Sequence, residues 1–77
     1  MITVEEMKAW PQRDDSDDTL WLVIPPDRRE ELLVQILIMG GHRESEDVWV
    51  LPKTGLIVSQ NLVYWRDWDR WHEFMNQ

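Results

Sequence analysis

Short apolar runs bounded by turn-forming residues mark the chain up to residue 60. Three of them, over residues 19–24, 47–51 and 55–59, are rich in β-branched and aromatic side chains, a composition typical of strands. The connection between the last two runs starts at Pro52 and reaches Gly55, the first residue of the last run. Proline early in a turn and glycine where φ is positive favour a tight connection. The sequence therefore predicts an antiparallel hairpin over residues 47–59.

The N-terminal segment, residues 2–10, has the signature of a short helix. Thr3 and Glu6 have the spacing of a capping box, in which two side chains satisfy free backbone N–H groups at the start of a helix. Ile2 and Met7 have the spacing of the hydrophobic staple that accompanies such a box. We expect this helix to end at Pro11, which cannot continue it.

Residues 31–39 carry conflicting signals. Asp27 with Glu30, and then Gly40, are start and stop signals of a helix. Against a helix stand β-branched residues at alternate positions, namely Val34, Ile36 and Ile38. A helix here is apolar on most sides, and a short chain has little material to cover it. We therefore predict a strand over residues 31–39, with a helix as the alternative.

A helical period begins after residue 60. Ser59 or Asn61 supplies an N-cap, and the helix is expected to run to about residue 75. Its apolar stripe is formed by Leu62, Tyr64, Trp65, Trp68, Trp71 and Met75. Such a stripe on one helical face predicts that the helix packs across the sheet.

These elements together predict a small single α+β domain over residues 1–77. Its centre is a three- to four-stranded antiparallel β-meander. A short N-terminal helix precedes the sheet, and a Trp-rich C-terminal helix packs on it. An acidic linker, residues 12–18, joins the N-terminal helix to the sheet.

Charge and cysteine content narrow the function. Fifteen acidic and eight basic residues give a net charge of −7, and the chain has no cysteine. Disulfides, thiolate catalysis and Cys-ligated metals are therefore excluded, and we expect a cytoplasmic protein, in the host cytoplasm if it is phage-encoded. The start of the chain lacks the pattern of a signal peptide, and no apolar run is long enough for a membrane span. Direct binding to nucleic acid or to an anionic membrane is disfavoured by the negative charge.

Candidate chemistry is weak throughout the chain. His72-Glu73 has no second histidine at zinc-binding spacing, and His42 lies in a polar loop. No serine sits in a nucleophile motif, and no glycine-rich phosphate loop is present. We expect no enzymatic activity, no catalytic residue, no cofactor and no metal site.

Acidic residues instead gather in two segments. They are Asp14, Asp15, Asp17 and Asp18 in the linker, and Glu44, Glu46 and Asp47 in a later loop. If the segments lie along one side of the molecule, they form a line of carboxylates that imitates DNA phosphates. Such a line docks on a basic surface of a partner protein, such as a nuclease or another nucleic-acid enzyme. The alternative is that the charge only keeps the protein soluble.

The function expected from this pattern is non-enzymatic inhibition of another protein, as in a phage-type anti-defence or anti-CRISPR inhibitor acting as a DNA mimic. An immunity protein or antitoxin that neutralises a toxin is one alternative. A structural module is another, dimerising through exposed Trp65, Trp68 and Trp71. The same tryptophans are otherwise expected to form the core of a small domain.

Overall fold

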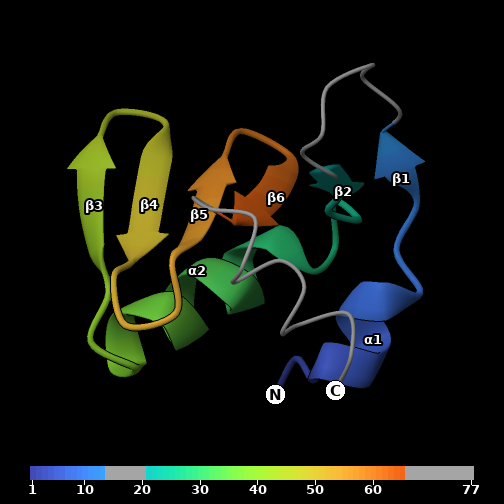
Figure 1. The fold of residues 1–77 in the computed structure, drawn as a ribbon, viewed down its shortest axis with the longest axis horizontal. Helices are drawn as coiled ribbons and strands as arrows, with labels where there is room; N and C mark the ends of the chain where they lie inside the picture. The colour runs from blue at the N-terminus through green and yellow to red at the C-terminus, as the bar shows by residue number, and fades with distance from the viewer. Residues whose placement is uncertain (14–20, 66–77) are drawn as a thin grey trace.

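The computed structural model describes residues 1–13 and 21–65, and the described residues form one six-stranded antiparallel sheet with two helices (Figure 1). The strand order is β1-β2-β6-β5-β4-β3. In chain order the elements are α1 (Val4–Lys8), β1 (Gln12–Arg13), β2 (Trp21–Val23), α2 (Arg29–Ile38), β3 (His42–Ser45), β4 (Val48–Leu51), β5 (Leu56–Ser59) and β6 (Leu62–Trp65). The prediction of three to four strands was wrong, because the edge strands β1 and β3 are short and polar and carry no apolar alternation.

Helix α1 begins where the capping residue predicted it. The Thr3 hydroxyl oxygen accepts a hydrogen bond from the Glu6 backbone N–H at 3.1 Å, and Ile2 and Met7 are both buried. The helix is shorter than the predicted residues 2–10. The carboxylate of Glu6 accepts hydrogen bonds from the Arg28 guanidinium. Glu6 therefore links α1 to the start of α2.

Helix α2 corrects the prediction of a strand over residues 31–39. Leu32 and Ile36, one helical turn apart, are both buried against the sheet. Between them, Gln35 turns toward the N-terminal segment. Its Oε1 accepts from the Ile2 N–H and its Nε2 donates to the Ile2 carbonyl, both at 2.9 Å. The strand prediction assumed that an apolar helix must be covered on every side, whereas this helix is covered on one side only.

Strand β6 corrects the predicted start of the C-terminal helix. Ser59 pairs with Leu62 across a tight turn in which Gln60 has a φ of 55°. Val63 and Trp65 point to the core, and Tyr64 points to the other face, where its ring lies 4.0 Å from that of Trp21 between centroids. This alternation of two residues overrides the helical spacing read from the sequence. The rest of the predicted helix, residues 66–75, lies outside the described residues.

The remaining predicted strands are found. Strand β2 lies within the predicted residues 19–24, and β4 and β5 form the predicted hairpin. Gly55 in its turn has a φ of 76°, as the turn chemistry requires. Strand β1 takes up the first two residues of the predicted acidic linker, and β3 takes up four of the seven residues, 40–46, for which the sequence predicts a polar loop.

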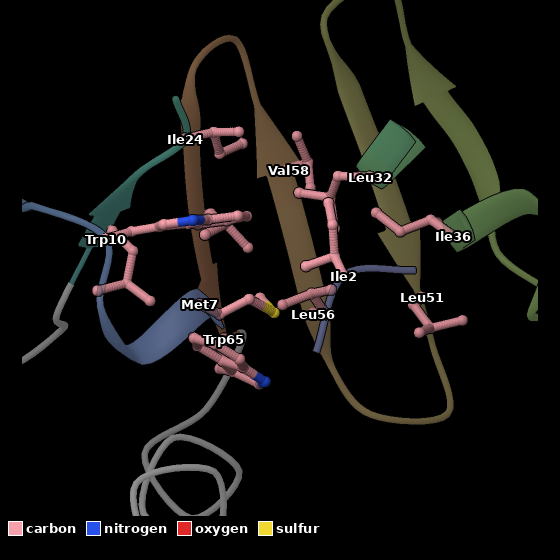
Figure 2. Close-up of a cluster of buried hydrophobic side chains, with 12 residues drawn as sticks. Ile2, Met7, Trp10, Ile24, Leu32, Ile36, Leu51, Leu56, Val58 and Trp65 are labelled. Atoms are coloured by element: carbon pink, nitrogen blue, oxygen red, sulfur yellow. The ribbon is translucent and has the colours of Figure 1, made fainter. Parts of the chain in front are cut away.

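The core lies between the two helices and one face of the sheet. Figure 2 shows Met7 and Ile2 of the N-terminal segment and Ile36 of α2 directed toward β5 and its neighbours. The cluster comprises Ile2, Met7, Trp10, Leu22, Ile24, Leu32, Ile36, Leu51, Leu56, Val58, Val63 and Trp65. In the part of the chain that the structure describes, no buried residue is polar or charged. Neither described helix has the length and apolar character needed to cross a membrane.

Candidate protein-interaction surfaces

The first candidate surface is the acidic turn, which we define as residues 44–47. It joins the edge strand β3 to β4, and Glu44, Glu46 and Asp47 are all exposed. The pairing of β3 with β4 is irregular between Arg43 and Ser45. Such an irregularity bends a strand, and here it occurs where the acidic residues begin.

The side chain of Arg43 binds the backbone of the acidic turn. Its Nε donates to the carbonyls of Ser45 and Glu46 at 3.0 and 3.2 Å, and its Nη2 donates to the Glu46 carbonyl at 2.6 Å. On the other side, the Gln60 N–H donates to the Asp47 carbonyl at 3.2 Å. The nearby basic side chain of Arg43 therefore binds backbone oxygens of the turn.

Trp49 connects the acidic turn to helix α2. The guanidinium carbon of Arg43 lies 5.2 Å from the centroid of the Trp49 ring, and that of Arg29 lies 5.4 Å from it. Both distances are within the range of cation–π attraction. Arg29 also donates from Nε to the Gln60 carbonyl at 2.7 Å. The first residue of α2, the β5–β6 turn and the acidic turn thus form one connected group.

A group of ion pairs joins helix α1, helix α2 and the N-terminus. Arg28 contacts Glu6 at 2.6 Å and Glu31 at 3.1 Å, and the N-terminal amine lies 3.5 Å from Glu31. The hydrogen bond from Arg28 lowers the pKa of Glu6, and burial opposes this only in part; the same bond raises the pKa of Arg28. Neither Glu46 nor Asp47 forms an ion pair with another described residue. Among the described residues, the charges of Glu46 and Asp47 are therefore not neutralised by an ion pair.

The second candidate surface is the α2 ridge, which we define as Val34, Leu37 and Ile38. These side chains are 51%, 50% and 79% exposed. They lie on the side of α2 opposite Leu32 and Ile36, because the spacing of three and four residues returns to the same side of a helix. Met39, which follows the helix, is 54% exposed. A cluster of exposed apolar side chains of this kind is a candidate for an interaction site.

The acidic residues proposed from the sequence are brought together only in part. Glu44, Glu46 and Asp47 share one exposed turn. Asp14, Asp15, Asp17 and Asp18 lie outside the described residues. Their described neighbours Arg13 and Trp21 are in β1 and β2, at the edge of the sheet opposite β3. The continuous line of carboxylates therefore stays a prediction.

The tryptophans proposed as a binding face divide differently. Trp65 is 6% exposed and belongs to the core cluster, which agrees with the core alternative for this residue. Trp68 and Trp71 lie outside the described residues. Trp10 is also buried, as is usual for a small domain that gains buried area from large rings.

The sequence did not predict three features of these candidate surfaces, namely the Arg43 contacts, the stacking on Trp49 and the α2 ridge. The ridge had a usable signal, because Glu30 and Gly40 already suggested a helix in which Val34 and Ile38 share one side. The Arg43 contacts had none, since no sequence pattern tells whether an arginine binds a carboxylate or a carbonyl. Among residues 1–13 and 21–65, no three His, Asp or Glu side chains come together as metal ligands.

Comparisons with known protein families, with curated proteins and with solved structures find no match to this chain. Its function is therefore inferred from its own surfaces.

Proposed function

We propose that this protein acts by binding another protein and blocking it, without catalysing a reaction. The acidic turn docks on a basic surface of the partner, and the acidic residues 14–18 extend the contact. Because carboxylates at such a surface occupy the place of phosphates, the expected partner is a nuclease or another nucleic-acid enzyme. A phage-type anti-defence or anti-CRISPR inhibitor in the host cytoplasm has this chemistry.

The observation that carries the proposal is how the acidic turn is held. Arg43 and Gln60 bind carbonyl oxygens of the turn, while Glu46 and Asp47 make no ion pair with a described residue. The backbone of the turn is fixed by hydrogen bonds, while the carboxylates of Glu46 and Asp47 are not held in an ion pair with a described residue. Fixing a binding loop in advance reduces the ordering that association requires, so more of the electrostatic attraction contributes to affinity.

The same geometry supports an immunity protein or antitoxin equally well, because its contact with a basic toxin follows the same physics. The structural-module alternative receives support from a different surface, since Trp65 is buried and the exposed apolar side chains lie on the α2 ridge.

The test begins with finding the partner. Tagged protein is used to capture host proteins at low salt, and the bound fraction is then released at high salt, because contacts between exposed charges are screened by salt. In parallel, the purified protein is titrated into a CRISPR effector nuclease, a restriction endonuclease and a base-excision glycosylase, and displacement of labelled DNA is measured. We expect one enzyme to lose its DNA at an equimolar ratio.

Variants then decide whether the acidic turn makes the contact. Glu46→Gln with Asp47→Asn is expected to weaken binding about tenfold or more, mainly through slower association. Replacing the four aspartates of residues 14–18 by Asn is expected to flatten the salt dependence. The matched control is Glu5→Gln with Asp27→Asn, which removes the same charge from two other exposed sites. If the control weakens binding as much as the turn variant, net charge alone acts, and the proposed site is wrong.

A further inference from the structure

Arg29, the first residue of helix α2, is connected to the acidic turn although it lies outside it. Its Nε donates to the Gln60 carbonyl at 2.7 Å, and its guanidinium carbon lies 5.4 Å from the centroid of the Trp49 ring. Gln60 donates its own N–H to the Asp47 carbonyl at 3.2 Å, and the Trp49 ring also lies against Arg43, at 5.2 Å. Two separate routes therefore lead from Arg29 to the turn.

The first route passes through the backbone of the β5–β6 turn, whose two residues are Gln60 and Asn61. Gln60 has a φ of 55°, a conformation that few residues other than glycine adopt. Its N–H binds the Asp47 carbonyl, and its own carbonyl accepts from Arg29. The Asn61 carbonyl accepts from the Ile24 N–H at 2.7 Å. The backbone of this turn therefore ties the acidic turn to the start of α2 and to the chain that leaves β2.

The second route passes through the side chain of Trp49 in β4. The planar guanidinium groups of Arg29 and Arg43 both lie within the range of cation–π attraction to its ring, and the ring packs against the core cluster. Arg43 at the same time donates to the carbonyls of Ser45 and Glu46. The ring therefore holds in place the guanidinium that fixes the backbone of the acidic turn.

The charge of Arg29 has the wrong sign for contact with a basic partner. A positive side chain close to the acidic turn repels such a partner, and removing it makes the protein one charge more negative. On charge alone, Arg29→Ala therefore strengthens binding. The hydrogen bond and the stacking of Arg29 lead to the opposite expectation, because a turn that is ordered before association loses less conformational freedom on binding. The two roles of Arg29 thus differ in the sign of their effect.

We propose that Arg29 is a positioning residue, which holds the acidic turn in its binding conformation through Gln60 and Trp49. Its effect on a partner rests on the proposed function, whereas its effect on the turn does not. Long-range attraction mainly sets the association rate, and the fit of the bound surfaces mainly sets the dissociation rate. Loss of Arg29 is therefore expected to speed dissociation and to leave association unchanged or slightly faster.

Amide hydrogen exchange of the free protein tests the positioning role without a partner. In Arg29→Ala the Gln60 amide, which donates to the Asp47 carbonyl, is expected to exchange about fivefold faster or more. The amide of Val58 in β5, which lies between β4 and β6, is the internal reference, because a loss of global stability raises the exchange of both amides together. Unchanged exchange at Gln60, or an equal rise at Gln60 and Val58, overturns the proposal.

Binding kinetics test the effect on a partner. The probe is the enzyme that loses its DNA in the titration described above. The matched control is Lys53→Ala, which removes one positive charge from the exposed β4–β5 turn at the opposite end of the strands (Figure 1). Arg29→Ala is expected to leave the enzyme about fivefold faster than the parent, whereas Lys53→Ala is expected to leave at the parent's rate. Equal dissociation rates of the two variants overturn the proposal.

The variant of the acidic turn separates this proposal from the proposed function. If Glu46→Gln with Asp47→Asn binds the enzyme as the parent does, the proposed function is wrong, and exchange at Gln60 alone then decides the positioning role. If that variant loses binding while Arg29→Ala keeps the exchange and the dissociation rate of the parent, the proposed function stands and the positioning role is overturned.

Discussion

The two sides of helix α2 carry the same kinds of side chain and have opposite fates. Leu32 and Ile36 on the inner side are 2% and 1% exposed, whereas Leu37 and Ile38 on the outer side are 50% and 79% exposed. Chemistry does not separate them. Their position relative to the sheet does, because only the inner side lies against β4 and its neighbours. Apolar character therefore predicts that a residue seeks cover, and the fold decides whether it finds cover within its own chain.

The largest expected effect comes from a matched pair of substitutions on these two sides. Ile36→Ala leaves a cavity in the core and is expected to lower the free energy of unfolding by about 2–5 kcal/mol. Ile38→Ala is expected to change it by less than about 0.5 kcal/mol, because the side chain is 79% exposed. Urea denaturation followed by tryptophan fluorescence measures both. Equal losses contradict the distinction between the two sides.

The end of α2 offers a second matched pair, Gly40 and Gly41. A methyl group added to Gly41 would lie 2.5 Å from the Val50 carbonyl oxygen and in steric clash with an Ile36 methyl carbon. Because the carbonyl is part of β4, Gly41→Ala is expected to cost about 2–3 kcal/mol. Gly40 has open space but a φ of 96°, so Gly40→Ala is expected to cost only about 1 kcal/mol. If backbone strain matters more here than the close approach of α2 to β4, Gly40→Ala will cost more stability than Gly41→Ala.

The conflicting sequence signals in α2 show why part of the fold could not be predicted. Glu30 and Gly40 indicate a helix, whereas the β-branched Val34, Ile36 and Ile38 favour a strand, and no local pattern shows that the helix is buried on one side only. At β6 the opposite error occurred, because a helix was predicted where a strand is found. The aromatic residues have a regular helical spacing, and the alternation of Val63 and Trp65 is too short to stand out against it. Local chemistry succeeded where it acts over a few residues, at the Thr3 cap and the turn ending in Gly55.

The candidate site, like the fold, could be predicted only in its local features. Exposed carboxylates at residues 44–47 follow from composition, because a run of charges is solvated. The fixing of that turn depends on Arg43 and on Gln60 of another hairpin. Contacts between segments far apart in sequence leave no local pattern, so neither this support nor the exposure of the α2 ridge could be derived from the chain alone.

Gln35 lies between the two sides of α2 and is expected to give an intermediate effect. Gln35→Leu removes both hydrogen bonds to the backbone of Ile2, and we expect a loss of about 1–2 kcal/mol because the freed groups are only partly buried. Hydrogen exchange of the Ile2 amide should rise together with this loss. The matched control is Val34→Leu on the outer side, which changes size without touching the N-terminal segment. If the exchange rate of the Ile2 amide is unchanged in Gln35→Leu, the two hydrogen bonds of Gln35 do not hold the N-terminal segment against α2.

The smallest expected effect concerns the ion pair between Glu6 of α1 and Arg28 at the start of α2. The hydrogen bond from Arg28 lowers the pKa of Glu6 below its ordinary value near 4.5, so the folded state favours the carboxylate. The stability gained is complete above that ordinary value and is lost as pH falls through the lower pKa of the folded state. Glu6→Gln is therefore expected to be slightly less stable than the parent at pH 7, with a difference that shrinks at pH 3. Both groups are about one-third exposed, at 32% for Glu6 and 29% for Arg28, so water screens much of their attraction. Urea midpoints at the two pH values measure the difference, with Glu5→Gln on the exposed side of α1 as the control. If the difference in stability is equal at both pH values, packing alone holds α1 against α2. Charge then contributes as little to stability on the inner side of α2 as it does on the α2 ridge, which has no charged residue.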